Sequence, residues 1–265
     1  MHIYFYLRPV GTLELPFSYN HIVQAAIYNS IDSKLASFLY EKGFEINGRK
    51  FRLFSFSRLY GEYLQDKNLS KILFPGEVRL VVSSPMEQFC QSIANVMLSR
   101  GYIRLGNCDA QVEKMTVQQF KVDEEKITIR ALSPVVVYST LLRPDGRKYT
   151  CYFQPEEPDY DVMVENNLRK KFQAFYGKEA PAGEVKVKRI GMIRQNLVNY
   201  KDTIIKGYSG KLVVTGPKEL LQMAVDAGLG SKNGQGFGCV EVCENLQRND
   251  DSCINKAQSL DFSVE

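Results

Sequence analysis

The segment HIYFYL, residues 2–7, begins the pattern that decides the fold. Its side chains fall alternately into two sets, His2, Tyr4 and Tyr6 against Ile3, Phe5 and Leu7. A period of two is typical of a strand with one buried face, so the sequence predicts a strand here. Residues 20–42 then repeat apolar side chains at helical spacing, and Asp32 is placed to cap a second piece. We expect one broken helix in this region.

The rest of the first half continues the alternation of strands and helices. Two β-rich stretches, residues 51–56 and 78–82, predict a pair of strands. Residues 86–98 predict a second amphipathic helix, and residues 111–120 predict a further strand. The resulting order, β-α-β-β-α-β, is that of the ferredoxin-like arrangement, which also underlies RNA-recognition domains.

The second half follows the same order. Its predicted elements are strands at 127–131 and 135–138, a helix at 160–176, strands at 185–193 and 207–214, a helix at 217–227 and a last strand at 237–242. The sequence therefore predicts the α+β class with two tandem ferredoxin-like (RRM-like) domains, residues 1–122 and 123–245. A polar tail, residues 246–265, follows them.

Composition narrows the class of protein. A chain of 265 residues with 44% hydrophobic and 24% charged residues can build two cores and is not generally disordered. No apolar run approaches the roughly 20 residues that span a bilayer, so we expect a cytoplasmic protein without a membrane partner. The six cysteines form no C-x-x-C pair and there are two histidines, which predicts free thiols, no metal site and no cofactor. The net charge of +4 requires any nucleic-acid surface to come from local clusters.

A glycine-rich stretch, GLGSKNGQGFGCV at residues 228–240, is the most specific local signal. Five glycines surround Lys232, at positions Gly228, Gly230, Gly234, Gly236 and Gly238. Glycine permits positive φ and close approach of the backbone, and successive N–H groups can form an anion-binding nest. A phosphate is therefore one candidate ligand of this loop.

The order of elements around the loop excludes two familiar phosphate sites. Dinucleotide-binding and P-loop motifs run from a strand through the loop into a helix. Here a predicted helix precedes the loop and a strand follows it. The alternative to an anion site is a helix-capping glycine and a connector that packs against the other domain.

The loop also carries a resemblance to a known family. Gly-Leu-Gly, a short polar spacer and Gly-Gln-Gly-Phe-Gly before a last strand resemble the C-terminal signature of the CRISPR-associated Cas-six endoribonucleases of the RAMP superfamily. The N-terminal stretches LPFSYNHIVQAAIYNSI (15–31), LASFLYEKGF (35–44) and RKFRLFSFSRL (49–59) resemble that family's first helix and following strand. The resemblance extends over essentially the whole chain.

The resemblance implies that the chain binds CRISPR repeat RNA and cuts the precursor within its repeats to give guide RNAs. Attack by a ribose 2′-OH, without a metal, would leave a 2′,3′-cyclic phosphate and a 5′-OH. Such chemistry needs a base for the 2′-OH, an acid for the leaving 5′-oxygen and cations for the charge at phosphorus. A CRISPR effector complex is a further implied partner, with the chain as a monomer or homodimer.

The catalytic residues that the resemblance implies are matched only in part. Tyr28 matches the family's tyrosine, Tyr40 stands where a histidine is expected, and Arg52, with Lys50 beside it, stands near the lysine. Arginine is too basic to shuttle protons, and a tyrosine with a pKa of about 10 is a poor base at neutral pH. His21 lies seven residues before Tyr28, nearly two helical turns, so it is a candidate base with Tyr28 as the acid; the alternative is a surface histidine.

Basic clusters supply the predicted RNA contacts. The residues predicted to bind RNA are Lys50, Arg58, Lys186, Lys188, Arg194, Gly230, Lys232, Gly234 and Gly236. The run Arg169–Lys171 is interpreted as the solvated face of a helix. Tyr4, Tyr6, Tyr19 and Tyr138 are candidates for stacking on unpaired bases.

Two other functions remain open from the sequence. One is a non-catalytic relative that binds the repeat and delivers it to an effector complex, which Tyr40 in the histidine position favours. The other is a nucleotide-binding metabolic or scaffold protein, because a ferredoxin-like fold serves many functions.

Overall fold

A computed structural model describes residues 1–201 and 203–243. The predicted polar tail, 246–265, lies outside the described residues. Within the described ranges, no helix has the length and apolar character that crossing a membrane requires.

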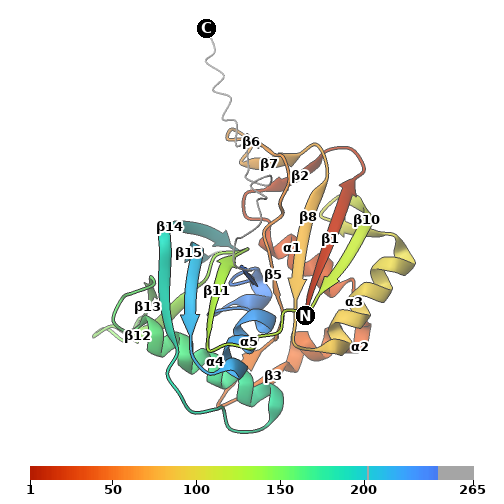
Figure 1. Cartoon of the computed structure of the whole chain (residues 1–265). Helices are drawn as coiled ribbons and strands as arrows, with labels where there is room; N and C mark the ends of the chain where they lie inside the picture. Colours follow the sequence, from red (N-terminus) through yellow and green to blue (C-terminus); the bar gives the residue numbers. More distant parts are fainter. Residues whose placement is uncertain (202, 244–265) are drawn as a thin grey trace.

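The first domain is built on a five-stranded sheet with the order β5-β8-β1-β10-β9 (Figure 1). Its strands are β1 (His2–Pro9), β5 (Ser55–Phe56), β8 (Val78–Ser83), β9 (Tyr102–Leu105) and β10 (Cys108–Gln118). Two helices lie against this sheet, α1 (Asn20–Tyr28) and α3 (Glu87–Arg100). Central strand β1 pairs antiparallel with both β8 and β10, as a ferredoxin-like domain requires.

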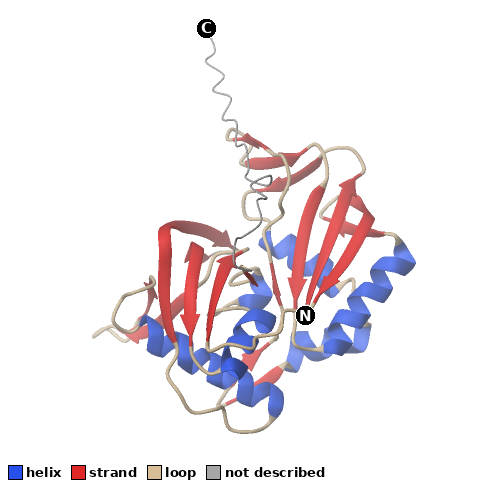
Figure 2. Ribbon diagram, viewed as in Figure 1, coloured by secondary structure: helices blue, strands red, loops and turns tan. Residues whose placement is uncertain are grey.

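The second domain repeats this topology in a four-stranded sheet with the order β14-β15-β11-β16. Figure 2 shows strands and helices in both halves of the molecule. The strands of the second domain are β11 (Lys126–Ala131), β14 (Lys186–Tyr200), β15 (Thr203–Thr215) and β16 (Val240–Val242), and its helices are α4 (Tyr160–Tyr176) and α5 (Lys218–Ala227). A hairpin of β12 (Val137–Leu142) and β13 (Lys148–Phe153) is inserted before α4. The predicted fold class, with two tandem ferredoxin-like domains, is confirmed.

Apolar spacing explains how the helices attach to their sheets. Buried Tyr160, Val164, Leu168 and Phe172 recur every four residues along α4 and form one stripe. The first-half helix is broken, as predicted, into α1, α2 (Ser33–Ser37) and a π-helical turn, η1 (Phe38–Lys42). Asp32 caps α2, because its carboxylate accepts hydrogen bonds from the backbone of the first turn.

The prediction of a single strand over 51–56 is wrong. The chain turns at Leu53, which has a φ of 50° and cannot continue a strand. Residues on either side join different partners: β4 (Arg49–Phe51) forms a hairpin with β3 (Phe44–Ile46), whereas β5 pairs with β8.

A small three-stranded sheet, which the sequence did not indicate, extends the first domain beyond the end of β1 (Figure 1). It consists of β2 (Leu13–Pro16), β7 (Lys71–Phe74) and β6 (Leu64–Asp66), with β7 paired antiparallel to both neighbours. The last predicted strand of the chain, 237–242, is shorter than expected. Strand β16 begins only at Val240, because the residues before it belong to the glycine-rich loop.

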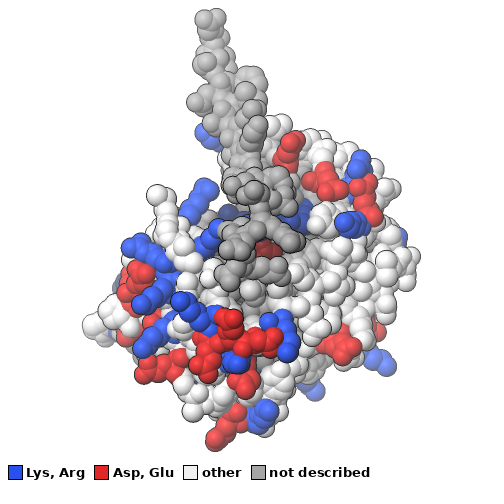
Figure 3. All heavy atoms as spheres, viewed as in Figure 1, with Lys and Arg blue, Asp and Glu red and all other residues white. Residues whose placement is uncertain are grey.

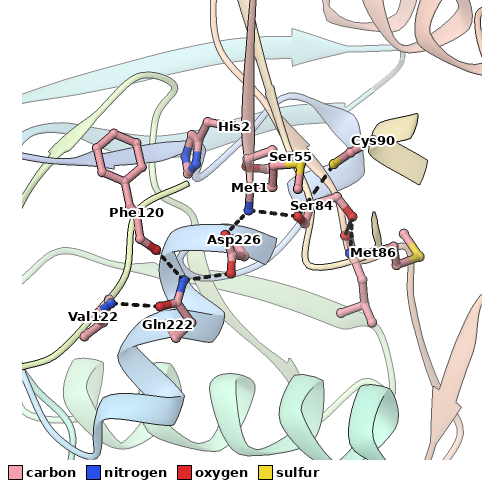
Figure 4. A network of polar contacts seen from close by, with 12 residues as sticks. Met1, His2, Ser55, Ser84, Met86, Cys90, Phe120, Val122, Gln222 and Asp226 are labelled. Atoms are coloured by element: carbon pink, nitrogen blue, oxygen red, sulfur yellow. Dashed lines mark hydrogen bonds and ion pairs between the residues drawn. The ribbon is translucent and has the colours of Figure 1, made fainter. Parts of the chain in front are cut away.

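A polar network joins the two domains (Figure 4). Asp226 on α5 pairs with the amino group of Met1, at the start of β1. Gln222, one turn earlier, donates to the Phe120 carbonyl at 2.9 Å and accepts from the Val122 backbone at 2.9 Å. Helix α5 of the second domain is therefore fixed to the first domain and to the segment that links them.

Candidate functional site: a cavity between the domains

A cavity of about 890 Å³ lies between the two domains. Its walls come from α1, the β3–β4 hairpin, β12, α4, the turn between β14 and β15, and the glycine-rich loop. Six cationic side chains line it, Arg49, Lys50, Arg52, Lys171, Lys201 and Lys232. Among the described lining residues there is no Asp or Glu, so the cavity presents a field of one sign that attracts a polyanion.

Aromatic side chains occupy the same walls. Four tyrosines and one phenylalanine line the cavity, Tyr28, Tyr40, Tyr138, Tyr200 and Phe51. Tyrosine rings beside cationic groups suit the stacking of unpaired bases along a bound backbone. The lining therefore combines cations that suit phosphates with aromatic faces that suit bases.

Three of the predicted catalytic residues meet in this cavity. The ring centroids of Tyr28 and Tyr40 are 6.1 Å apart in an edge-to-face arrangement. Arg52 donates from Nη2 to the Tyr40 carbonyl at 2.7 Å, which holds its guanidinium beside the π-helical turn. Gly43, with a φ of 65°, ends that turn, and a Cβ there would lie 2.6 Å from Arg52 Nη1. Burial raises the pKa of Tyr28, and the nearby Arg52 charge opposes that shift.

The glycine-rich loop packs between the domains. Gln24 of α1 donates to the Gly234 carbonyl at 2.5 Å, and Asn20 donates to the Gly236 carbonyl at 3.2 Å. A Cβ at Gly236 would lie 2.6 Å from the Phe56 ring, so only glycine fits there. Of the two interpretations of the loop, the structure supports close packing against the other domain.

One side chain of the loop still faces the cavity. Lys232 Nζ lies 5.1 Å from the centroid of the Tyr138 ring, and burial lowers the pKa of its amine. Gly234 lines the cavity, whereas Gly230 and Gly236 do not. The loop therefore combines a packed backbone with a cation directed toward the candidate ligand.

Comparison with known proteins agrees with these features. Residues 14–116 match the family model for the N-terminal part of the CRISPR-associated protein Cas6, and residues 115–242 match the model for its C-terminal part. The chain belongs to the Cas6 family. Together the two models extend over both ferredoxin-like sheets except strand β1.

Individual Cas6 proteins are similar over most of their length. The CRISPR-associated endoribonuclease Cas6 1 of Methanocaldococcus jannaschii is 27% identical over 234 residues, which cover 87% of this chain and 88% of that protein. The CRISPR-associated endoribonuclease Cas6 of Pyrococcus furiosus is 26% identical, covering 86% of this chain and 84% of that protein. The solved structure of a Cas6-related protein from Pyrococcus furiosus has a TM-score of 0.79 at 19% identity, covering 92% of this chain and 99% of that chain.

The candidate base His21 does not line the cavity between the domains. It belongs to the first turn of α1, is exposed, and donates from Nδ1 to the Ser18 carbonyl at 2.8 Å. Tyr28, on the same helix, does line the cavity. The structure thus brings together Tyr28, Tyr40 and Arg52 but leaves His21 apart from them.

The predicted RNA contacts divide between the Cas6 cavity and the outer face of the second sheet. Lys186, Lys188 and Arg194 are exposed along β14 and do not line the cavity. Figure 3 shows Lys and Arg side chains gathered over the second domain, with Asp and Glu side chains among them. Arg58 donates to the Asn196 side chain at 2.9 Å, which joins the first domain to β14.

The expectation that Arg169–Lys171 forms a solvated face is wrong. Lys171 is only 2% exposed, and its Nζ donates to the carbonyls of Gly228 at 2.6 Å and Gly230 at 2.9 Å. Burial lowers the pKa of Lys171 to about 7. Arg169 is occupied as well, by Glu165 at 2.8 Å.

Sequence reasoning missed Lys171 because its partners are loop carbonyls almost 60 positions away along the chain. The available signal was positional, since Lys171 directly precedes Phe172 of the buried stripe and lies four residues after Asn167. Asn167 was missed too, although it is 7% exposed and lines the cavity beside Lys171.

Two stacking candidates are part of the core instead. Tyr4 is 8% exposed and donates to Glu241 at 3.2 Å. Tyr19 is 9% exposed, and its hydroxyl accepts from the Leu59 backbone at 3.2 Å. Neither ring is available to stack on a nucleotide base of the RNA, whereas Tyr138 lines the cavity.

Proposed function

We propose that this chain is a metal-independent endoribonuclease that binds CRISPR repeat RNA in the cavity between its domains and cleaves it there. The observation that carries the proposal is the lining, with six Lys and Arg side chains, four tyrosines and no carboxylate among its described residues. Two similar Cas6 proteins are named endoribonucleases. Guide RNAs released from a precursor would be the product.

Two residues that line the cavity, Arg52 and Tyr28, suit separate parts of the reaction. Attack by the 2′-OH on the adjacent phosphorus forms a cyclic phosphate while the bond to the leaving 5′-oxygen breaks. Arg52 stabilises the negative charge that collects on the phosphate oxygens. Tyr28 keeps its proton at neutral pH because the ordinary pKa of tyrosine is about 10 and burial raises the pKa of Tyr28 further, so it donates to the leaving oxygen.

Two residues are candidates for the base that removes the 2′-OH proton. Tyr40 lines the cavity and is 72% exposed, with its ring against Tyr28. His21 carries an imidazole that can accept a proton, but it reaches the RNA only if the strand continues along α1 beyond the cavity. Mutation of each residue separates the two proposals.

A non-catalytic role, in which the chain binds the repeat and delivers it to an effector complex, is the second candidate. The observation that favours it is that no histidine occurs among the described lining residues. Without a base that titrates near neutral pH, proton removal from the 2′-OH is slow. This alternative shares the binding site and differs only in the chemistry.

One experiment separates these functions. The protein is incubated with its repeat RNA in EDTA, and the single-turnover cleavage of wild type is compared with that of Tyr28→Phe, Tyr40→Phe and His21→Ala. We expect a product that ends in a 2′,3′-cyclic phosphate and a rate about 100-fold lower in Tyr28→Phe, with binding retained. A loss of similar size in His21→Ala identifies the base as His21, and one in Tyr40→Phe identifies it as Tyr40. Tight binding without cleavage by wild type supports the non-catalytic role instead.

A further inference from the structure

The buried face of α4 offers a contact that the catalytic residues do not use. We propose that Asn167, beside Lys171 on this face, pairs with the edge of one unpaired adenine or cytosine of the bound RNA. Asn167 then helps to select the sequence that occupies the cavity. This inference rests on the proposed binding of RNA between the domains.

The first support is that the Oδ1 atom of Asn167 is buried without a hydrogen-bond partner. Its side chain lines the cavity, is 7% exposed, and its buried Oδ1 makes no hydrogen bond within the described ranges, 1–201 and 203–243. A buried polar group without a hydrogen bond is costly and rare in folded proteins. The Oδ1 acceptor therefore requires a hydrogen-bond donor from outside the protein.

Two other buried asparagines provide a direct comparison. Asn233, which also lines the cavity, donates to the carbonyls of Leu229 at 3.2 Å and Phe237 at 3.1 Å. Asn196 accepts from Arg58 at 2.9 Å. Both have structural bonds, so the unpartnered Oδ1 of Asn167 is a property of that position and not of buried asparagines in this fold.

The neighbouring lysine does not supply the missing bond. Lys171 Nζ is directed to the carbonyls of Gly228 and Gly230, and so fixes the start of the glycine-rich loop against α4. Lys171 is a positioning residue, because it holds the loop that carries Lys232 into the cavity. On this face of α4, Lys171 therefore contacts the glycine-rich loop, and Asn167 contacts the ligand.

The chemistry of the amide selects a base over a phosphate. A carboxamide presents an acceptor beside a donor, which matches an amino group beside a ring nitrogen on adenine or cytosine. A phosphate has only acceptor oxygens, and the exposed cations of the cavity suit it better. Tyrosine rings on the same walls can hold the flanking bases by stacking.

The test measures the affinity of the full chain for a series of repeat RNAs by fluorescence anisotropy. In each RNA one unpaired adenosine or cytidine is replaced by uridine or by an abasic site. We expect wild type to lose about tenfold in affinity at one position, and Asn167→Ala to bind the parent RNA about tenfold more weakly while ignoring that position. Asn199→Ala, which replaces an exposed asparagine outside the cavity, is the matched control and should keep the wild-type profile.

Thermal unfolding distinguishes this role from a structural one. Because Asn167 Oδ1 has no partner to lose, Asn167→Ala should melt at or above the wild-type temperature, and Asn167→Ser provides a smaller polar replacement. An Asn167→Ala protein that keeps the wild-type position profile overturns the inference. Failure of wild type to prefer repeat RNA over a scrambled RNA would instead reject the proposed function itself.

Discussion

The cavity and strand β14 are two basic regions of this molecule that differ in how their cations are compensated. On β14, two of the four cations are compensated, because Lys186 pairs with Glu184 at 3.0 Å and Arg189 pairs with Glu156 at 3.0 Å. The cavity cations have no carboxylate beside them among the described lining residues. Uncompensated charge marks a site for a polyanion, whereas exposed ion pairs contribute little to binding or stability. The difference teaches that clustering of Lys and Arg alone does not identify an RNA site.

Removal of one cation from each region is the strongest test of this comparison. Arg52→Ala should lower the single-turnover cleavage rate by about 100-fold or more, because the charge at phosphorus loses its stabilising cation. Lys186→Ala should stay within about twofold of wild type, since it removes an exposed ion pair. Cleavage assays at saturating protein measure both rates. Equal losses in the two variants would contradict the distinction between the regions.

Lys170 and Lys171 are adjacent on α4 but differ in burial. The pH dependence of stability tests whether the buried lysine alone contributes to it. Burial lowers the folded pKa of Lys171 to about 7, below its ordinary value of 10.5, so the unfolded chain binds more protons between these pH values. The free energy of unfolding should therefore rise with pH across this window, and the contribution is lost as pH falls toward 7. The expected gain between pH 7 and pH 9 is about 2 kcal/mol.

Urea denaturation of wild type, Lys171→Met and Lys170→Met at both pH values measures that contribution. Lys171→Met should lack the gain, because its side chain binds no proton in either state. Lys170→Met, the matched control on the same helix, should keep it. If Lys170→Met lost the gain and Lys171→Met kept it, the assignment of the effect to the buried lysine would be wrong.

Much of the fold could be predicted because its signals are local. The spacing of apolar residues predicted α4 at its observed bounds, and the cap at Asp32 was predicted from one residue type. The break at Leu53 has no such signal, since leucine has no local preference for a positive φ, and the hydrogen bond that its carbonyl accepts comes from distant Ser84 at 2.8 Å. Local sequence patterns therefore predicted α4 and the cap of α2, whereas the strand break at Leu53 could not be predicted from its own segment.

The candidate site was only partly predictable for the same reason. Tyr28, Tyr40 and Arg52 lie within one N-terminal stretch, so a resemblance could point to them together. Asn167 and Lys171 join the cavity only because α4 packs beneath the loop at Gly228 and Gly230. The helical position of Lys171 beside the buried stripe indicates burial, but no periodicity in the sequence identifies the loop carbonyls as its partners.

The salt dependence of RNA affinity gives the smallest expected effect and the most direct count of phosphate contacts. Each phosphate contact that is lost lowers the slope of log affinity against log salt by about 1. Lys50→Ala and Lys232→Ala should each show this decrease, because both residues line the cavity, whereas Lys186→Ala should leave the slope unchanged, because Lys186 is paired with Glu184. Anisotropy titrations between low and moderate salt measure the three slopes. A decrease in Lys186→Ala equal to that in Lys50→Ala would extend the RNA path onto β14, and pairing with a carboxylate would then no longer separate the two regions.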